Sequence, residues 1–135
     1  MKPSLRPGLS TTVRIPIDRG RTIGFMGDDG RVYSTPSMVH DFEYSTRDFL
    51  MDHLDAGEDT VGAHVSVDHL GPTLEGDTVE IVLTVTEVDG RRISVEATMR
   101  DSIEEVGRGL HRRFIVDVAR QHARLTAKRA KLLIR

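Results

Sequence analysis

Hydrophobic and polar residues alternate along most of the chain, with two interruptions near its beginning. The stretch TTVRIPID places Val13, Ile15 and Ile17 on one face, which predicts a first strand. The next segment, RGRTIGFMGDDGR, holds four glycines and three arginines and indicates a loop. The apolar residues then recur every three to four positions, which is the period of a helix.

One helix of about five turns is predicted to begin near Thr35 and to end before DAGED at 55–59. The Thr35 hydroxyl could cap free backbone N–H groups, and Pro36 suits the first helical position. The apolar positions at helical spacing are Met38, Phe42, Phe49, Leu50 and Leu54. Between them the helix carries His40, Asp41 and Glu43, where a buried helix should be apolar, so these three polar residues call for an explanation.

Four consecutive antiparallel strands are predicted between residues 60 and 117. The first, TVGAHVSVDHL, and the last, EEVGRGLHRRFIVDV, enclose two strands joined at Asp89-Gly90, a dipeptide that favours a tight type I′ turn. Gly107 and Gly109 interrupt the last strand, which suggests a bulge or the close approach of another backbone. The positions predicted to share one face within each strand are Val61, Ala63, Val65, Val67 and His69; Val79, Ile81, Leu83 and Val85; and Ile93, Val95, Ala97 and Met99.

The order strand, long helix, four strands and short final helix is an α+β layout with one sheet on one helix. With 135 residues the chain has room for a single hydrophobic core. We therefore expect one domain over residues 1–119, followed by a basic helix or tail over residues 120–135.

Charge separates these two parts. Residues 120–135 hold six of the 19 basic residues and none of the 21 acidic ones, so the rest of the chain has 13 basic and 21 acidic residues. An acidic body argues against nucleic acid as a partner. The basic segment is either a solvated end or a binding element for an acidic partner, such as the phosphates of coenzyme A or an acyl carrier protein.

Several kinds of chemistry and location are disfavoured by the composition. The chain has no cysteine, which excludes thiol nucleophiles and disulfides and fits a reducing compartment. The first residues lack the apolar core of a secretory signal, and no stretch is apolar for the ~18 residues of a membrane span. We expect a cytoplasmic protein that does not enter a membrane. The histidines lack metal-ligand spacing, so no metal site is expected.

Three motifs in this order resemble one known family. YSTPSMVHDFE, TVGAHVSVDHLGPTLEGDTV and VGRGLHRRFIVD are similar to the hotdog-fold thioesterases, in particular the fluoroacetyl-CoA thioesterase-like family, and the likeness runs from Val13 to Asp117. This resemblance implies a hotdog fold, in which an antiparallel sheet wraps around one long central helix. It also implies hydrolysis of an acyl thioester, no cofactor apart from the coenzyme A of the substrate, and a homodimer with active sites at its interface.

The resemblance further implies the site residues. Thr35, Glu43 and His69 match the catalytic triad of such enzymes, Gly62 matches the glycine whose N–H lies near the thioester carbonyl, and Arg113 matches an arginine of the final strand. Glu43 could act as a general base or as a nucleophile. Thr35 suits the orientation of the carbonyl, and His69 suits positioning or proton transfer. Arg113 would pair with a coenzyme A phosphate or with an acidic side chain.

A candidate acyl pocket comprises Phe25, Met26, His40 and Phe42. His40 and Asp41 could line this pocket, which would favour a polar acyl group, or they could face solvent or a partner subunit. Two other functions remain open from the sequence. One is a hotdog hydratase or dehydratase, and the other is a module that binds acyl-CoA without turnover.

Overall fold

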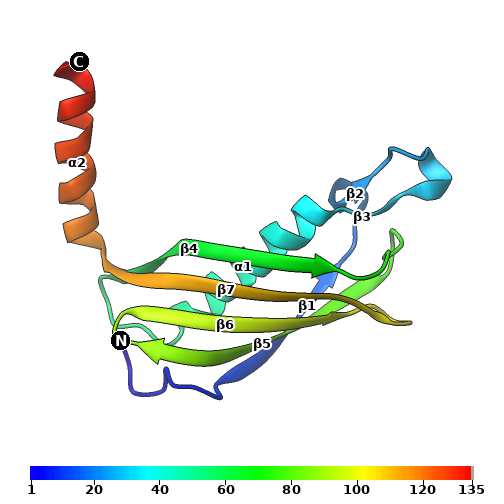
Figure 1. The fold of residues 1–135 in the computed structure, drawn as a ribbon, viewed down its shortest axis with the longest axis horizontal. Helices are drawn as coiled ribbons and strands as arrows, with labels where there is room; N and C mark the ends of the chain where they lie inside the picture. Colours follow the sequence, from blue (N-terminus) through cyan, green and yellow to red (C-terminus); the bar gives the residue numbers. More distant parts are fainter. Residues whose placement is uncertain (135) are drawn as a thin grey trace.

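A curved antiparallel sheet lies across the long helix α1 in the computed structural model, which describes residues 1–134 (Figure 1). Arg135, the last residue of the predicted basic segment, lies outside the described residues. The five strands of the main sheet are ordered β1-β5-β6-β7-β4, and every neighbouring pair is antiparallel. The elements are β1 (Ser10–Pro16), β2 (Thr22–Ile23), β3 (Val32–Tyr33), α1 (Thr35–Met51), β4 (Glu58–His69), β5 (Thr78–Asp89), β6 (Arg92–Arg100), β7 (Glu105–Asp117) and α2 (Val118–Ile134). The predicted α+β layout, one sheet around one long helix, is confirmed.

The core is formed by the apolar faces of β5 and β6 against α1. All eight positions predicted for these two strands are buried, namely Val79, Ile81, Leu83 and Val85, and Ile93, Val95, Ala97 and Met99. They pack in one cluster with Met38, Phe42 and Leu50 of α1. Each fully buried aliphatic side chain stabilises the fold by about 1.5–3 kcal/mol, so this layer fixes the position of α1 on the sheet.

The β5–β6 hairpin closes where the sequence predicts, but with a different turn. Asp89 pairs with Arg92, so the two turn residues are Gly90 and Arg91. Gly90 has a φ of 59°, whereas Arg91 does not have a positive φ. A type I′ turn needs positive φ at both central positions, so the predicted turn type is wrong although the hairpin is right.

The glycines of β7 accommodate side chains of α1. A Cβ atom at Gly107 would lie 2.9 Å from the sulfur of Met38, and one at Gly109 would lie 2.4 Å from the ring of Phe42. Other atoms therefore approach these two glycines closely, as expected, but most of them belong to side chains of α1 and not to another backbone. This lets α1 lie close to the centre of the sheet.

A bulge in β4 changes which residues face the helix. The pairing of β4 with β7 shifts between Gly62 and His64, which leaves Ala63 as an extra residue. Thr60 and Gly62 therefore lie opposite Ile115 and Arg113, on the same face as Val65, Val67 and His69 opposite His111, Gly109 and Gly107. The prediction that Val61 and Ala63 share the inner face is wrong, because one extra residue reverses the alternation.

Two segments stand out from the sheet and α1 in Figure 1. The predicted loop between β1 and α1 forms an arm, in which β2 and β3 pair and Phe25 and Met26 are 89% and 75% exposed near its tip. At the other end of the sheet, α2 projects as a helix of 17 residues, longer than the short helix expected. Neither α1 nor α2, the long helices of residues 1–134, has the length and hydropathy to cross a membrane.

Candidate active site

The start of α1 brings two of the predicted catalytic residues together. Ser34, rather than Thr35, caps the helix, because its hydroxyl accepts a hydrogen bond from the N–H of Ser37 at 3.1 Å. Thr35 is the first helical residue, and its hydroxyl is thereby free to pair with His69 Nδ1 at 2.8 Å. The prediction that Thr35 caps the helix is wrong, and the released hydroxyl lies at the helix N-terminus beside an imidazole.

His69 is half-buried at the end of β4. Burial lowers the pKa of its imidazole, so the ring is neutral at pH 7. Its Nε2 atom is buried and has no hydrogen-bond partner among the described residues. A buried ring nitrogen without a partner is costly, which makes Nε2 a candidate to meet a group from outside this chain, and the nearby Gly71 backbone partly opposes the pKa shift of the ring.

Glu43 lies in a second cluster, farther along α1. A Cβ atom placed on Gly62 would lie 3.7 Å from Glu43 Oε2 and 3.4 Å from Arg113 Nη1, so the carboxylate and the guanidinium meet above this glycine. The three residues line one pocket of about 390 Å³, together with Tyr44, Arg47 and Asp48. The bulge in β4 creates this arrangement because it turns Gly62 toward the helix.

Arg113 is buried and firmly held. Its Nε donates to Thr60 Oγ1 at 2.7 Å, and its Nη2 donates to the Thr60 carbonyl at 2.8 Å. Burial lowers the pKa of Arg113, and the nearby Glu43 carboxylate opposes this shift. Arginine keeps its charge under such conditions. The guanidinium therefore presents a fixed positive charge to Glu43.

His111 completes this second cluster and is a residue that the sequence analysis missed. Its Nδ1 lies 2.7 Å from the His64 carbonyl, which can only accept, so Nδ1 carries the proton and Nε2 accepts from Arg113 Nη1 at 3.2 Å. Burial and the Arg113 charge lower the pKa of His111. The signal in the sequence is the H-x-R spacing of VGRGLHRRF, which puts both side chains on the inner face of β7.

The predicted triad is thus divided within one chain. Thr35 and His69 meet at the N-terminal end of α1, whereas Glu43 lies eight residues farther, about 12 Å along the helix. The cluster of Thr35 and His69 and the cluster around Glu43 are each ordered, and neither contains all three residues of the predicted triad.

The four predicted pocket residues lie in three different places. Phe25 and Met26 are exposed on the arm, and His40 is exposed on α1, where its ring stacks on Tyr44 at 4.0 Å between centroids. Phe42 is fully buried, edge-on to His111. Within one chain these four residues do not share a pocket, and the acyl pocket stays a prediction.

Asp41 has a structural partner that the sequence analysis did not consider. It is buried and accepts hydrogen bonds from Arg21 Nε at 3.0 Å, Arg21 Nη2 at 3.2 Å and the Tyr33 hydroxyl at 2.6 Å. Burial and Asp41 raise the pKa of Tyr33, which keeps it a neutral donor. Asp41 therefore neither lines an acyl pocket nor faces solvent. It ties both sides of the arm to α1.

Asp41→Ala should lower the free energy of unfolding by about 2 kcal/mol, because it leaves the buried Tyr33 hydroxyl unpaired and removes two hydrogen bonds of Arg21, which keeps only its ion pair with Asp18. Asp48→Ala, which removes an exposed carboxylate of the same helix, is the matched control and should change it by less than about 0.5 kcal/mol. Urea unfolding of the two variants measures the difference, and equal stabilities would contradict the role given to Asp41.

The stability of the protein should fall as the pH drops below about 6.5. Burial lowers the native pKa of both His69 and His111, so the unfolded chain takes up protons that the folded chain does not. The contribution is complete above the unfolded pKa and declines below it, by at most about 1.4 kcal/mol per pH unit for each histidine. Urea unfolding between pH 7.5 and 5 tests this, and His111→Gln should flatten the slope. An unchanged slope would exclude a neutral His111.

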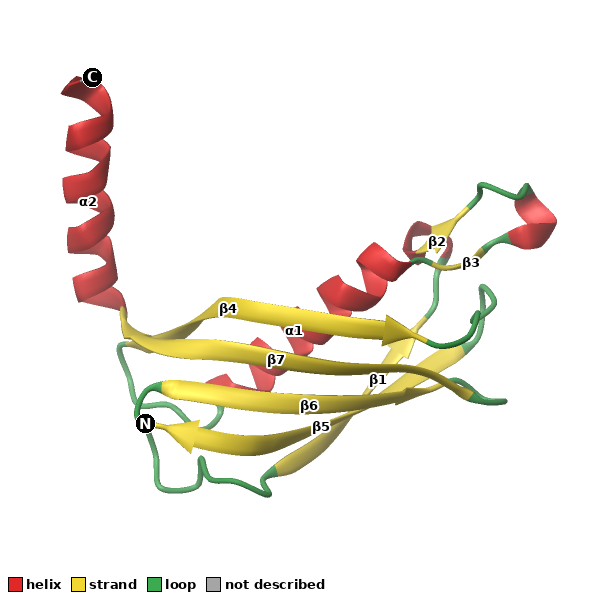
Figure 2. Cartoon of the chain, viewed as in Figure 1, coloured by secondary structure: helices red, strands yellow, loops and turns green. Residues whose placement is uncertain are grey.

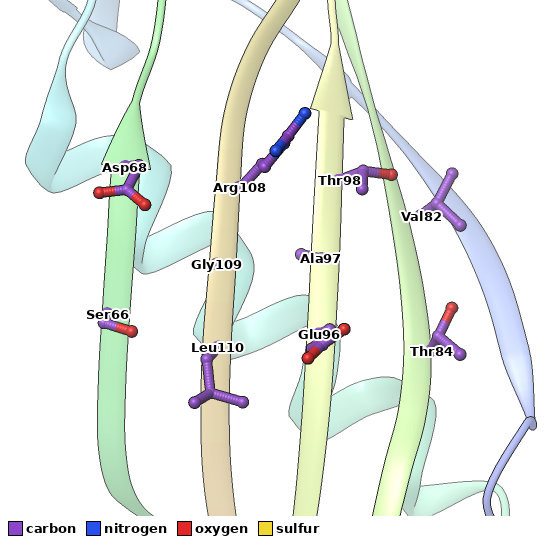
Figure 3. A pocket seen from close by; sticks show the side chains of 10 residues that line it. All are labelled: Ser66, Asp68, Val82, Thr84, Glu96, Ala97, Thr98, Arg108, Gly109 and Leu110. Atoms are coloured by element: carbon purple, nitrogen blue, oxygen red, sulfur yellow. The ribbon is translucent and has the colours of Figure 1, made fainter.

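The face of the sheet away from α1 is also hollowed (Figure 3). The hollow is a pocket of about 570 Å³. Its lining residues are Ser66, Asp68, Val82, Thr84, Glu96, Ala97, Thr98, Arg108, Gly109 and Leu110. None of these ten residues belongs to the predicted site. The helix-facing side of the sheet therefore remains the candidate.

Comparison with known proteins decides the family. The family model described as fluoroacetyl-CoA-specific thioesterase matches residues 17–119. The chain belongs to this family. The fluoroacetyl-CoA thioesterase of Streptantibioticus cattleyicolor is a relative, 29% identical over 97 residues, which are 72% of this chain and 70% of that protein. The predicted membership of the hotdog-fold thioesterases is thereby confirmed.

Solved structures of thioesterases share the fold. A thioesterase superfamily member from Thermus thermophilus matches 100% of both chains with a TM-score of 0.88 at 22% identity. The fluoroacetyl-CoA thioesterase FlK matches with a TM-score of 0.81 at 24% identity, over 92% of this chain and 97% of FlK. A variant of FlK has been solved in complex with fluoroacetate and CoA, and it matches with a TM-score of 0.77.

Proposed function

We propose that the protein hydrolyses an acyl-CoA thioester to a carboxylic acid and free thiol. Membership of the thioesterase family supports the reaction class. The observation that carries the assignment of residues is the pair of clusters on one face of the sheet, Thr35 with His69 and Glu43 with Gly62 and Arg113. Together they offer a carboxylate, a hydroxyl and a neutral imidazole, which suit acyl transfer to water.

A homodimer would join the two clusters into one site. β4 is an edge strand of the main sheet, with a free edge of 12 residues. Two copies related by a two-fold axis would pair these edges antiparallel. If residues 62–69 of the two strands pair, His69 of one β4 lies opposite Gly62 of the other. The Thr35 and His69 of one chain would then face the Glu43 of its partner.

In the proposed reaction, water attacks the thioester carbon and the bond from carbon to sulfur breaks. Glu43 either removes a proton from the water or attacks first, forming an acyl intermediate that water then hydrolyses. The Thr35 hydroxyl at the start of α1 and the Gly62 N–H would stabilise the charge on the carbonyl oxygen. When Glu43 acts as the base, His69 would relay the proton that Glu43 takes from water to the departing thiolate, through its unpartnered Nε2. No cofactor is needed beyond the coenzyme A of the substrate.

Arg113 would act through Glu43 and not on the substrate. Two hydrogen bonds fix its guanidinium to Thr60, and its Nη1 is shared with His111. A fixed positive charge attracts the nearby carboxylate and orients it. We therefore assign Arg113 a positioning role, in place of contact with a coenzyme A phosphate.

Release of free thiol from a panel of short, branched, hydroxylated and aromatic acyl-CoAs tests this proposal. We expect rapid release from at least one class, and the same acyl groups on pantetheine and on an acyl carrier protein identify the preferred carrier. A hydratase would change an enoyl group without releasing thiol, and a binding module would show affinity without turnover. Either outcome would overturn the proposal.

A further inference from the structure

The helix α2 has the features of a binding element. None of its 17 residues is buried, and it holds five basic and no acidic residues: Arg120, Arg124, Lys128, Arg129 and Lys131. Arg120, Arg124 and Lys128 follow one another at intervals of four, so like charges lie side by side on the helix. Leu125 and Leu132 are exposed on the same helix, one heptad apart. An isolated helix of this length gains little stability from propensity alone, so such a surface calls for an acidic and apolar partner.

A surface with the opposite charge lies at the other end of the sheet. The loop at residues 70–77 and the turn at residues 101–105, which we call the acidic rim, hold five carboxylates and no basic residue: Glu75, Asp77, Asp101, Glu104 and Glu105. The rim also exposes three large apolar side chains, those of Leu70, Leu74 and Ile103.

The acidic rim is held in shape by hydrogen bonds between its two segments. The Thr73 hydroxyl donates to Asp101 at 3.0 Å, and the Ser102 hydroxyl donates to Asp77 at 2.8 Å. Glu105 is already paired with Arg108, but Glu104 is exposed and Glu75 has only a contact of 4.0 Å with Arg19. Exposed carboxylates on a fixed surface are suited to receive the basic face of a helix.

These two surfaces cannot meet within one chain. α2 leaves the sheet beside Glu58, whereas the acidic rim begins after His69, at the opposite end of β4. Twelve residues of strand separate the two ends by roughly 36 Å. Pairing of two β4 edges in the proposed dimer reduces this separation to roughly 13 Å, because His69 of one chain then lies four residues along the strand from Glu58 of the other.

The direction and length of α2 fit such a contact. In Figure 1, α2 rises past β4 and away from the rest of its own sheet, toward the side where a second copy would add its strands. Seventeen residues of helix are about 25 Å long, which matches the width of five strands at about 4.8 Å each. One α2 could therefore cross the end of the second sheet, where the acidic rim lies.

An apolar groove between α2 and β4 offers a specific contact. It has a volume of about 180 Å³, and its apolar lining residues are Val61, Val116, Val118 and Leu125. The chain that continues beyond the His69 end of a paired β4 would reach this groove with Leu70, whose side chain is 53% exposed in its own chain. The groove accommodates one such side chain by size and polarity.

We propose that α2 of one chain docks on the acidic rim of a second copy of this chain, with Leu70 of the second copy in the groove between α2 and β4. This inference rests on the dimer of the proposed function. It assigns the basic C-terminal segment to assembly rather than to coenzyme A or a carrier protein. The α2 helix of each chain would then stabilise the acidic rim of its partner, which lies beside the partner's Thr35 and His69.

Cross-linking tests this contact, and the natural absence of cysteine gives a clean background. The double variant Leu70→Cys, Leu125→Cys, treated with a short bis-maleimide, should form a covalent dimer in high yield. The matched control Thr12→Cys, Leu125→Cys places the first cysteine on β1, the edge of the sheet farthest from β4, and should remain uncross-linked. Sedimentation of the untreated proteins gives the native mass.

The outcomes separate the docking of α2 from the proposed function. A dimeric mass without cross-linking above the control would overturn the docking of α2 and leave the β4 interface intact. A monomeric mass with full thioesterase activity would overturn both the docking and the shared active site. A dimeric mass with a specific cross-link supports the contact.

Charge reversal gives a second, independent measurement. Arg124→Glu with Lys128→Glu should weaken dimerisation about tenfold, since each exposed ion pair changes an equilibrium constant only several-fold. Adding Glu75→Lys and Glu104→Lys to the same chain should restore the affinity. Weakening without rescue would overturn the pairing with the acidic rim. An unchanged dimer that loses affinity for coenzyme A would assign α2 to the substrate instead.

Discussion

Glu43→Gln should reduce the turnover number for acyl-CoA hydrolysis about a thousandfold. The amide keeps the shape of the side chain in its pocket beside Gly62 and Arg113 but can neither accept a proton from water nor attack a carbonyl. Asp48→Asn is the matched control, because it neutralises another carboxylate of the same pocket and should leave turnover within about threefold of the wild type. Thiol release measures both variants.

The melting temperature of Glu43→Gln should remain close to that of the wild type, because the Glu43 side chain is only half-buried and forms none of the hydrogen bonds that hold Arg113. A fully active Glu43→Gln protein would remove Glu43 from the reaction. A protein that loses both activity and stability would indicate a structural role for the carboxylate.

Mixed dimers provide the sharpest form of this test. Glu43→Gln and His69→Ala chains should each be inactive alone, yet co-expression should recover about a quarter of the wild-type activity. Half of the dimers would be mixed, and each would hold one intact site, made from His69 of one chain and Glu43 of the other. A site contained within one chain would recover nothing.

The alternation of apolar and polar residues was sufficient to predict the main sheet. The inner faces follow a period of two from Val79 to Val85 in β5 and from Ile93 to Met99 in β6, and every predicted position is buried. In β4 the same rule failed at Ala63, because a bulge inserts one residue and reverses the faces that precede it. That single residue turns Gly62, rather than Val61, toward Glu43, so the geometry of the candidate site depends on a feature that periodicity does not reveal.

Polar residues inside the fold were harder to assign than apolar ones. Asp41 looked like a pocket or surface residue because its partners, Arg21 in the predicted loop and Tyr33 just after it, lay outside the predicted strands and helices. His111 was missed because its role depends on the His64 carbonyl at the bulge. Such partners are brought together only by tertiary structure, whereas a hydrophobic period is a local property of the chain.

Gly109→Ala should lower the free energy of unfolding by about 3 kcal/mol, the upper part of the usual range for overpacking. The new Cβ would lie 2.4 Å from Phe42 Cε2 and 3.0 Å from the Ser66 carbonyl oxygen, so both α1 and β4 would have to move. Gly20→Ala, where the nearest atom lies at 3.6 Å, is the control and should be close to neutral. Urea unfolding measures both.

Phe42→Leu should relieve most of this cost. A shorter side chain removes the ring atom nearest to the new Cβ, so Gly109→Ala should cost clearly less in the Phe42→Leu background than in the wild type. Additive effects would show that the contact between α1 and β7 does not limit stability. Because the same contact sets the height of α1 above the sheet, Gly109→Ala should also displace Glu43 from Gly62 and lower turnover more than binding.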